Sequence, residues 1–225
     1  RHHTHANTHT SRVVQFHAVF ARETTKPRPM PMYSVWLEPP PATIGARTQK
    51  FIADVASRVP SAPMFAPHVT LLGGFTFVSD EAACVAFDAV LVREKEHRAE
   101  GAEAPLRCST SAILCGDRRH QCVYVNLEKT QALVAAFETA NAVIALPGAS
   151  SDTFMPHMSL AYGIDDEGVR DGVRADAEAT LLGDDPRALD FDVASYSLWK
   201  TDIEDDSCDS WVRLASASFR NGLEM

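Results

Sequence analysis

Two short stretches of the chain carry the same set of chemically active side chains. FAPHVTLLGG and FMPHMSLAYG share five of ten aligned positions, and their histidines lie 89 residues apart. In both stretches a hydroxyl follows the histidine after one intervening residue, giving His68 with Thr70 and His157 with Ser159. Histidine titrates near neutral pH, so two of them can supply one base and one acid to the same reaction.

Such a set of groups suits the hydrolysis of a phosphodiester. A neutral imidazole takes a proton from water while an imidazolium protonates the leaving oxygen. Hydroxyl donors stabilise the charge on the phosphoryl group, so neither a metal nor a cofactor is needed. A single histidine on a strand is more often structural than catalytic. Beyond the first 31 residues there are four histidines, His68, His97, His120 and His157. Two of these, His68 and His157, fall in matched contexts. This match favours one shared site.

Each motif must sit on a strand for its two side chains to act together. Side chains alternate across a strand, so the histidine and the hydroxyl of each motif face the same way. Pro67 and Pro156 come immediately before the histidines, where the start of a strand tolerates a missing N–H. If the two strands are related by an approximate two-fold axis, both pairs face one cleft.

The order of the predicted elements repeats once along the chain. Hydrophobic periodicity predicts helices at 42–59, 79–97, 130–144 and 165–182, and strands at 32–38, 68–77, 106–115, 121–127, 157–163, 191–201 and 211–219. Apart from a missing opening strand, the second half repeats the first. The pattern predicts an α+β fold of two pseudo-symmetric lobes, each with a mainly antiparallel sheet and flanking helices. No linker of distinct composition separates them, so residues 32–225 are expected to form one bilobal domain.

The first 31 residues differ from the rest. They hold five of the nine histidines, five basic side chains and a single acid, Glu23. Two interpretations remain open: a disordered leader, or the remnant of an organelle transit peptide. We therefore expect a cytoplasmic protein, with an organelle as the alternative if this segment is a targeting signal.

Charge and hydropathy restrict the partners. Residues 30–225 carry 16 basic and 29 acidic side chains, a formal charge of −13, and no basic stripe. This balance argues against binding to a long nucleic acid. No apolar run approaches the roughly 20 residues that span a bilayer. We expect a monomer that acts on a small phosphorylated ligand, without contact to a membrane.

Several of these stretches together carry a family resemblance. HVTL and HMSL, in their repeated half-domains, resemble the paired motifs of the 2H phosphoesterase superfamily. YSVWLEPP, HMSLAYG and LWKTDIEDDSCDSW are similar to the plant-type cyclic phosphodiesterases of that superfamily. The resemblance implies metal-independent opening of ADP-ribose 1″,2″-cyclic phosphate, a by-product of tRNA splicing, to ADP-ribose 1″-phosphate. It also implies opening of nucleoside 2′,3′-cyclic phosphates to 2′-phosphates.

The resemblance also implies roles for single residues. The four motif residues would line a central, water-filled cleft, the histidines as the acid–base pair and the hydroxyls as phosphate ligands: His68, Thr70, His157 and Ser159. The pseudo-symmetry leaves the two histidine roles open, with His157 favoured as the base. Tyr162 would contact the ligand. Trp36 would either stack on a base or pack in the core.

Two disulfides follow from the resemblance alone. It pairs Cys84 with Cys208, and Cys115 with Cys122 across the stretch CGDRRHQC, although the latter spacing differs slightly from that of the family. Cys108 would then be left over, buried and reduced. The alternative is five free thiols, which is the usual state in a reducing compartment.

Other functions stay open on the sequence alone. A non-catalytic nucleotide-binding module of the same fold would keep the histidines, although both intact hydroxyls argue against it. A 2H phosphodiesterase acting on oligonucleotides is a further alternative, against which the acidic surface argues. Zinc-binding C-x-x-C or H-x₃₋₅-H spacings do not occur beyond the first 31 residues, and the G-x-S-x-G motif of serine hydrolases is missing.

Overall fold

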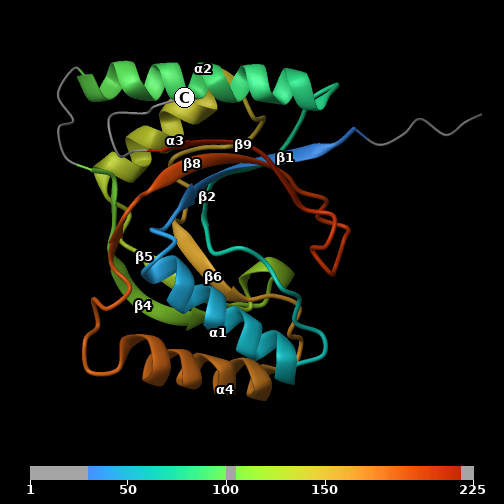
Figure 1. Cartoon of the computed structure of the whole chain (residues 1–225), viewed down its shortest axis with the longest axis vertical. Coiled ribbons are helices and arrows are strands. Elements are labelled where there is room, and N and C mark those ends of the chain that lie inside the picture. Colours follow the sequence, from blue (N-terminus) through green and yellow to red (C-terminus); the bar gives the residue numbers. More distant parts are fainter. Residues whose placement is uncertain (1–29, 100–104, 219–225) are drawn as a thin grey trace, which may run out of the picture.

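A single large antiparallel sheet organises the molecule. The computed structural model describes residues 30–99 and 105–218, so most of the predicted leader lies outside the described residues. The sheet has seven strands in the order β4-β5-β6-β2-β1-β8-β9 (Figure 1). Their bounds are β1 Met32–Glu38, β2 Val69–Thr76, β4 Thr110–Cys115, β5 Val123–Leu127, β6 His157–Ala161, β8 Ser195–Lys200 and β9 Val212–Ser218. A separate two-stranded sheet pairs β3 (Arg107–Cys108) with β7 (Phe191–Asp192).

The sheet divides into two lobes at the junction of β2 and β6. Strands β2, β1, β8 and β9 form the first lobe, and β4, β5 and β6 form the second. Among the described residues, the two lobes are paired at one position, Val69 with Met158. Both side chains are completely buried. The structure confirms the predicted fold of two lobes with antiparallel sheets.

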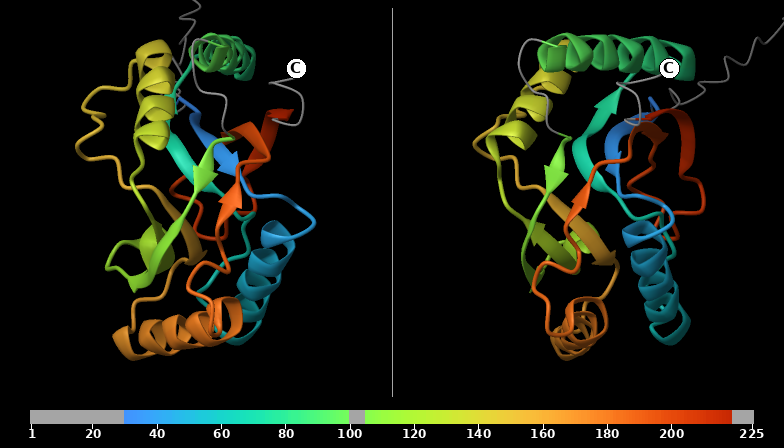
Figure 2. Two further views of the ribbon diagram at one scale, coloured as in Figure 1. Left: turned by 90° about the vertical axis from the view of Figure 1, so that its left-hand side faces the viewer. Right: turned by 60° about the vertical axis from the view of Figure 1, so that its left-hand side comes forward.

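Each lobe receives a helix from the other half of the chain. Helices α2 (Asp80–Ala99) and α3 (Gln131–Ile144) cover the first lobe, whereas α1 (Ile44–Arg58) and α4 (Glu167–Ala177) lie against the second (Figure 2). Thus α1 follows β1 but packs beside β6, and α3 follows β5 but packs beside β2. This exchange merges the apolar faces of both lobes into one core, which explains why no linker separates them. No helix among the described residues is long and apolar enough to cross a bilayer.

Four predicted elements differ in detail. The strand predicted over 191–201 is split, so that β7 (Phe191–Asp192) pairs with β3 in the small sheet and β8 (Ser195–Lys200) with β1 in the large one. The strand predicted over 106–115 breaks at Ser109, because the N–H of Thr110 turns to donate to the carboxylate of Asp190 at 2.7 Å. The helix predicted over 165–182 ends as a π-helical turn, η2 (Glu178–Leu182), before Gly183. The end of the polar turn GDRRH forms a short 3₁₀ helix with the next residue, η1 (Arg119–Gln121), so the strand predicted from Gln121 begins at Val123.

The chain leaves β6 through a glycine that has no room for a side chain. Gly163 has a φ of 67°, and a Cβ atom there would lie 2.5 Å from the carbonyl oxygen of Ser61. Its N–H donates to the carbonyl of Arg119 in η1 at 3.0 Å. Gly163 therefore brings three segments together: the end of β6, the segment after α1 that contains Ser61, and η1.

Replacing this glycine should destabilise the fold. We expect Gly163→Ala to lower the free energy of unfolding by about 1–3 kcal/mol, because it adds left-handed strain and a steric clash with Ser61. Gly172→Ala in α4 is the matched control, since a Cβ atom there meets no atom within 4 Å and alanine favours a helix. Urea unfolding would measure both. Equal stability of Gly163→Ala and the wild-type protein would contradict the role assigned to Gly163.

Candidate active site

The two motifs meet where the lobes join. The pairing of Val69 with Met158 is antiparallel, so the same register places His68 opposite Ser159 and Thr70 opposite His157. The four motif residues therefore occupy one small area of the sheet, on the face opposite to the buried Val69 side chain. Each histidine lies across from the hydroxyl residue of the other motif, as the pseudo-symmetry requires.

A cleft of about 380 Å³ opens over this area. His68 and Thr70 line it from the first lobe and His157 lines it from the second. Its wall also includes Arg118 and His120, and no aspartate or glutamate is among the described residues that line it. In a chain with an excess of acidic side chains, a cleft without acids suits an anionic ligand.

Both motif histidines are held in the same tautomer. Nδ1 of His68 lies 2.7 Å from the carbonyl oxygen of Ala66, and Nδ1 of His157 lies 2.9 Å from that of Met155. A carbonyl oxygen only accepts hydrogen bonds, so each Nδ1 carries the proton. In the neutral rings, Nε2 then keeps its lone pair. The amide Nε2 of Gln121 lies 3.4 Å from Nε2 of His157, which agrees with an accepting nitrogen there.

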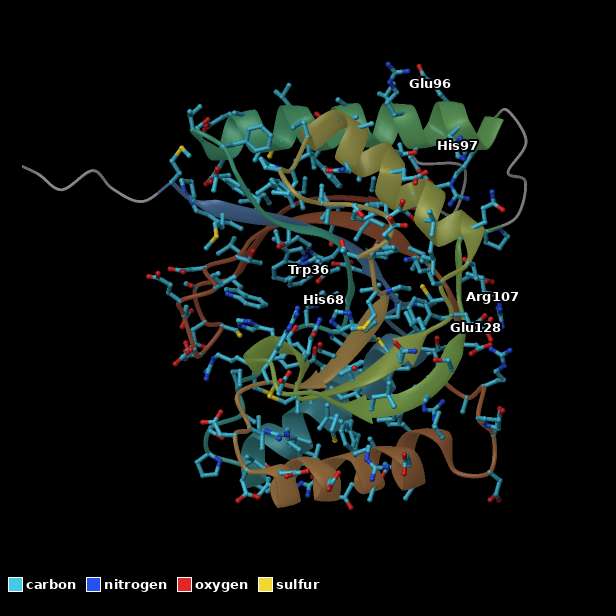
Figure 3. The ribbon with its side chains drawn as sticks, turned by 180° about the vertical axis from the view of Figure 1, so that it is seen from behind. Trp36, His68, Glu96, His97, Arg107 and Glu128 are labelled. Carbon is cyan, nitrogen blue, oxygen red and sulfur yellow. The ribbon has the colours of Figure 1, made fainter. Side chains whose placement is uncertain are left out.

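A tryptophan fixes the ring plane of His68. The ring of Trp36 stacks on His68 with 3.5 Å between centroids and 6° between planes (Figure 3). Trp199 stacks on Trp36 at 4.2 Å. The strands β2 and β8 flank β1, so these two neighbours reach Trp36 from opposite sides. Trp36 is among the residues that line the cleft, but it is only 1% exposed and stacks on both rings, so it offers no free face to a nucleobase.

Burial keeps both histidines neutral in the free protein. It lowers the pKa of His68 to about 3; the hydrogen bond to Ala66 opposes this effect, and the nearby His157 adds to it. Burial also lowers the pKa of His157, and the hydrogen bond to Met155 opposes it. An anion bound between the two rings would favour their charged forms and raise both pKa values.

The two hydroxyl residues are placed differently. Thr70 lies on the wall of the cleft, half-buried, as predicted. Ser159 is buried, is not on the wall, and donates its hydroxyl to the carbonyl oxygen of His120 at 3.0 Å. A buried carbonyl needs a donor, so Ser159 holds η1 against β6, and its hydroxyl lies buried beneath the cleft-lining residue His120. The structure therefore brings three of the four motif side chains to the wall.

Tyr162 anchors an aromatic wall, and sequence reasoning missed most of its other members. Tyr162 stacks on Phe65 at 3.8 Å between centroids and contacts the edge of His120 at 5.1 Å. Trp211, from the loop between β8 and β9, lies 6.0 Å from His120. Burial raises the pKa of Tyr162 above its ordinary value, so its hydroxyl stays protonated. The signal for His120 was its position in the polar turn GDRRH, next to two arginines.

Neither predicted disulfide is formed, since all five cysteines are free. Cys115 ends β4, paired with Val123, whereas Cys122 lies in the bend after η1 with a helical φ of −70° and ψ of −51°. The thiol of Cys115 is directed at Asp171 of α4, whereas that of Cys122 donates to the carbonyl oxygen of Arg119 at 3.2 Å.

The other predicted pair is separated by the architecture. Cys84 lies on α2 and packs against the main core. Cys208 packs in a second apolar cluster with Ile52, Phe65 and Tyr162, beside the cleft. The two thiols thus belong to different packing clusters.

Comparison with known proteins agrees with the geometry. The sequence model described as the 2′-5′ RNA ligase superfamily matches residues 39–205. A protein of Arabidopsis thaliana named cyclic phosphodiesterase is 26% identical over 184 residues, which cover 82% of this chain and 93% of that protein. The E. coli LigT structure complexed with phosphate aligns with a TM-score of 0.50 at 12% sequence identity, and the alignment covers 84% of this chain and 97% of the LigT chain. A structure described as a phosphoesterase aligns with a TM-score of 0.51 at 13% sequence identity, covering 84% of this chain and 98% of the other.

The charge state of the histidines can be measured directly. Histidine-selective NMR titration of the free protein should show a neutral His68 throughout pH 4.5–8, because its pKa is about 3. His157 should titrate below the ordinary histidine value of about 6.5. Inorganic phosphate should raise both pKa values. It should not change the NMR chemical shifts of the His97 ring, because His97 lies on α2 away from the cleft (Figure 3). Protonation of His68 near pH 6.5 in the free protein would refute this description of the site.

Proposed function

Because this chain belongs to the 2′-5′ RNA ligase superfamily, the 2H phosphoesterases, we propose that it is a phosphodiesterase that opens cyclic phosphates by paired histidine catalysis. The proposed substrates are ADP-ribose 1″,2″-cyclic phosphate and nucleoside 2′,3′-cyclic phosphates, opened to ADP-ribose 1″-phosphate and nucleoside 2′-phosphates. One observation carries the proposal: two histidines with the same fixed tautomer line one cleft that has no acidic side chain among the described residues of its wall. The Arabidopsis relative named cyclic phosphodiesterase supports the substrate class.

The reaction needs one histidine in each protonation state. Nε2 of the neutral histidine takes a proton from water, whose oxygen attacks phosphorus. The bond from phosphorus to one ring oxygen breaks, and Nε2–H of the other histidine protonates that oxygen. Thr70 and the imidazolium donate to the phosphoryl oxygens as charge accumulates on them. No group outside the cleft is required.

Binding of the anionic substrate favours protonation of the histidine that acts as the acid. Both histidines are neutral in the free cleft, so the acid must gain its proton when the anionic phosphate binds. His157 is less buried than His68 and loses less hydration on charging, which favours it as the acid. His68 then serves as the base, and the face of Trp36 stabilises the imidazolium that forms on it. This assignment reverses the sequence-based preference for His157 as the base.

Single histidine variants test the roles. With 2′,3′-cyclic AMP in EDTA, the wild-type kcat should show a bell-shaped dependence on pH. We expect His68→Ala to remove the acidic limb, where the base becomes protonated, and His157→Ala to remove the basic limb, where the acid loses its proton. Each should lower kcat by roughly 10²–10⁴-fold.

Two outcomes would contradict the proposal. Loss of wild-type turnover in EDTA that a divalent ion restores would point to metal-assisted hydrolysis. Near-normal turnover of either motif variant would leave the binding-module alternative as the better account. His97→Ala, on the outer helix α2, is the control and should keep wild-type rates.

A further inference from the structure

One arginine at the cleft has nothing to bind. Among the arginines that the structure describes, Arg118 is the one whose side chain makes no hydrogen bond or ion pair; the others bind carboxylates or carbonyl oxygens. Its neighbour Arg119 is engaged with the carboxylate of Asp206 at 2.6 Å. Arg118 lies on the wall of the cleft, where no acid among the described residues is present to neutralise it. Its natural partner is therefore an anion that enters with the ligand.

The backbone that carries Arg118 is held firmly. Its carbonyl accepts from the N–H of Gln121 at 2.8 Å, and the next carbonyl accepts from Gly163 at 3.0 Å. The hydroxyl of Ser159 fixes the carbonyl of His120. The guanidinium thus extends from a fixed turn, and only its own side chain must be ordered when a ligand binds, which limits the entropic cost of binding.

The indole ring of Trp211 lines the same cleft from the other lobe. Trp211 is partly exposed, and its Nε1 donates to the carbonyl oxygen of Asp202 at 2.8 Å. The ion pair between Arg119 and Asp206 ties its loop to the turn that carries Arg118. A guanidinium and an indole that line one cleft match a phosphate and a base of the same ligand, because guanidinium groups bind phosphate in a bidentate manner and indoles stack on bases.

We propose that Arg118, together with Trp211, forms a subsite for a second phosphate and its base, which makes Arg118 a specificity-determining residue. The cyclic phosphate occupies the space between His68 and His157, and the second phosphate of the same nucleotide binds Arg118. The preferred substrates are then cyclic phosphates of nucleotides that carry a further phosphate, ahead of plain nucleoside cyclic phosphates. This inference rests on the proposed function.

A pair of substrates that differ by one phosphate tests the subsite. The wild-type protein should hydrolyse adenosine 5′-phosphate 2′,3′-cyclic phosphate with a higher kcat/KM than adenosine 2′,3′-cyclic phosphate. Arg118→Gln should lower kcat/KM for the 5′-phosphorylated substrate by roughly 10–100-fold, mainly through KM, as expected for a lost hydrogen bond to a charged group. The loss for the other substrate should be much smaller. Arg118→Lys should recover part of the preference, and rising salt should weaken it.

Arg93→Gln is the matched control, because Arg93 is exposed on the outer helix α2 and should not affect the preference. An equal ratio of kcat/KM values in wild-type and Arg118→Gln proteins would overturn the subsite. Should the wild-type protein turn over neither substrate, the proposed function fails, and calorimetric binding of ADP then tests the subsite by itself. Weaker binding of ADP by Arg118→Gln would support it, and unchanged binding would refute it.

Discussion

The site depends on a single point of pairing between two strands. Val69 and Met158 join the lobes, and both are fully buried. Because the pairing is antiparallel, the residues on either side of this point are the two histidines and the two hydroxyl residues of the motifs. A shift of one strand by one residue would turn the histidine and hydroxyl of its motif to the opposite face, away from those of the other motif. The exchange of α1 and α3 between the lobes packs the side chains of Val69 and Met158 into one core, which favours this register.

Burial and hydrogen bonding then set the chemistry. The carbonyls of Ala66 and Met155 hold the proton on Nδ1 of each histidine, so that Nε2 keeps the lone pair in both neutral rings. Removal from water keeps the two rings neutral until an anion arrives. The acidic side chains of the loop between β8 and β9 are not on the cleft wall: the carboxylate of Asp205 is bound by its own loop, and that of Asp206 by Arg119. A chain with a large negative charge can therefore still bind a phosphate.

The sequence predicted the parts of the fold that depend on local patterns. The duplicated histidine motifs predicted two related strands and a shared cleft, and periodicity predicted the four long helices. Local patterns could not show that α1 and α3 pack on the opposite lobes, since that packing depends on contacts between residues far apart in the chain. Trp36 was recognisable as aromatic, but only the register of β1 between β2 and β8 shows that it stacks on His68. The turn with Arg118 and His120 carried no periodic signal. The disulfides inferred from family resemblance are not formed, because the thiols of each pair contact different parts of the fold.

The central claim is that His68 and His157 act in one transition state. A double-mutant cycle of kcat with 2′,3′-cyclic AMP, using His68→Ala, His157→Ala and the double variant, measures this coupling most directly. If the two histidines act as one unit, the double variant should be little slower than the slower single variant. If the two losses multiply, the histidines contribute independently, and the paired mechanism is contradicted.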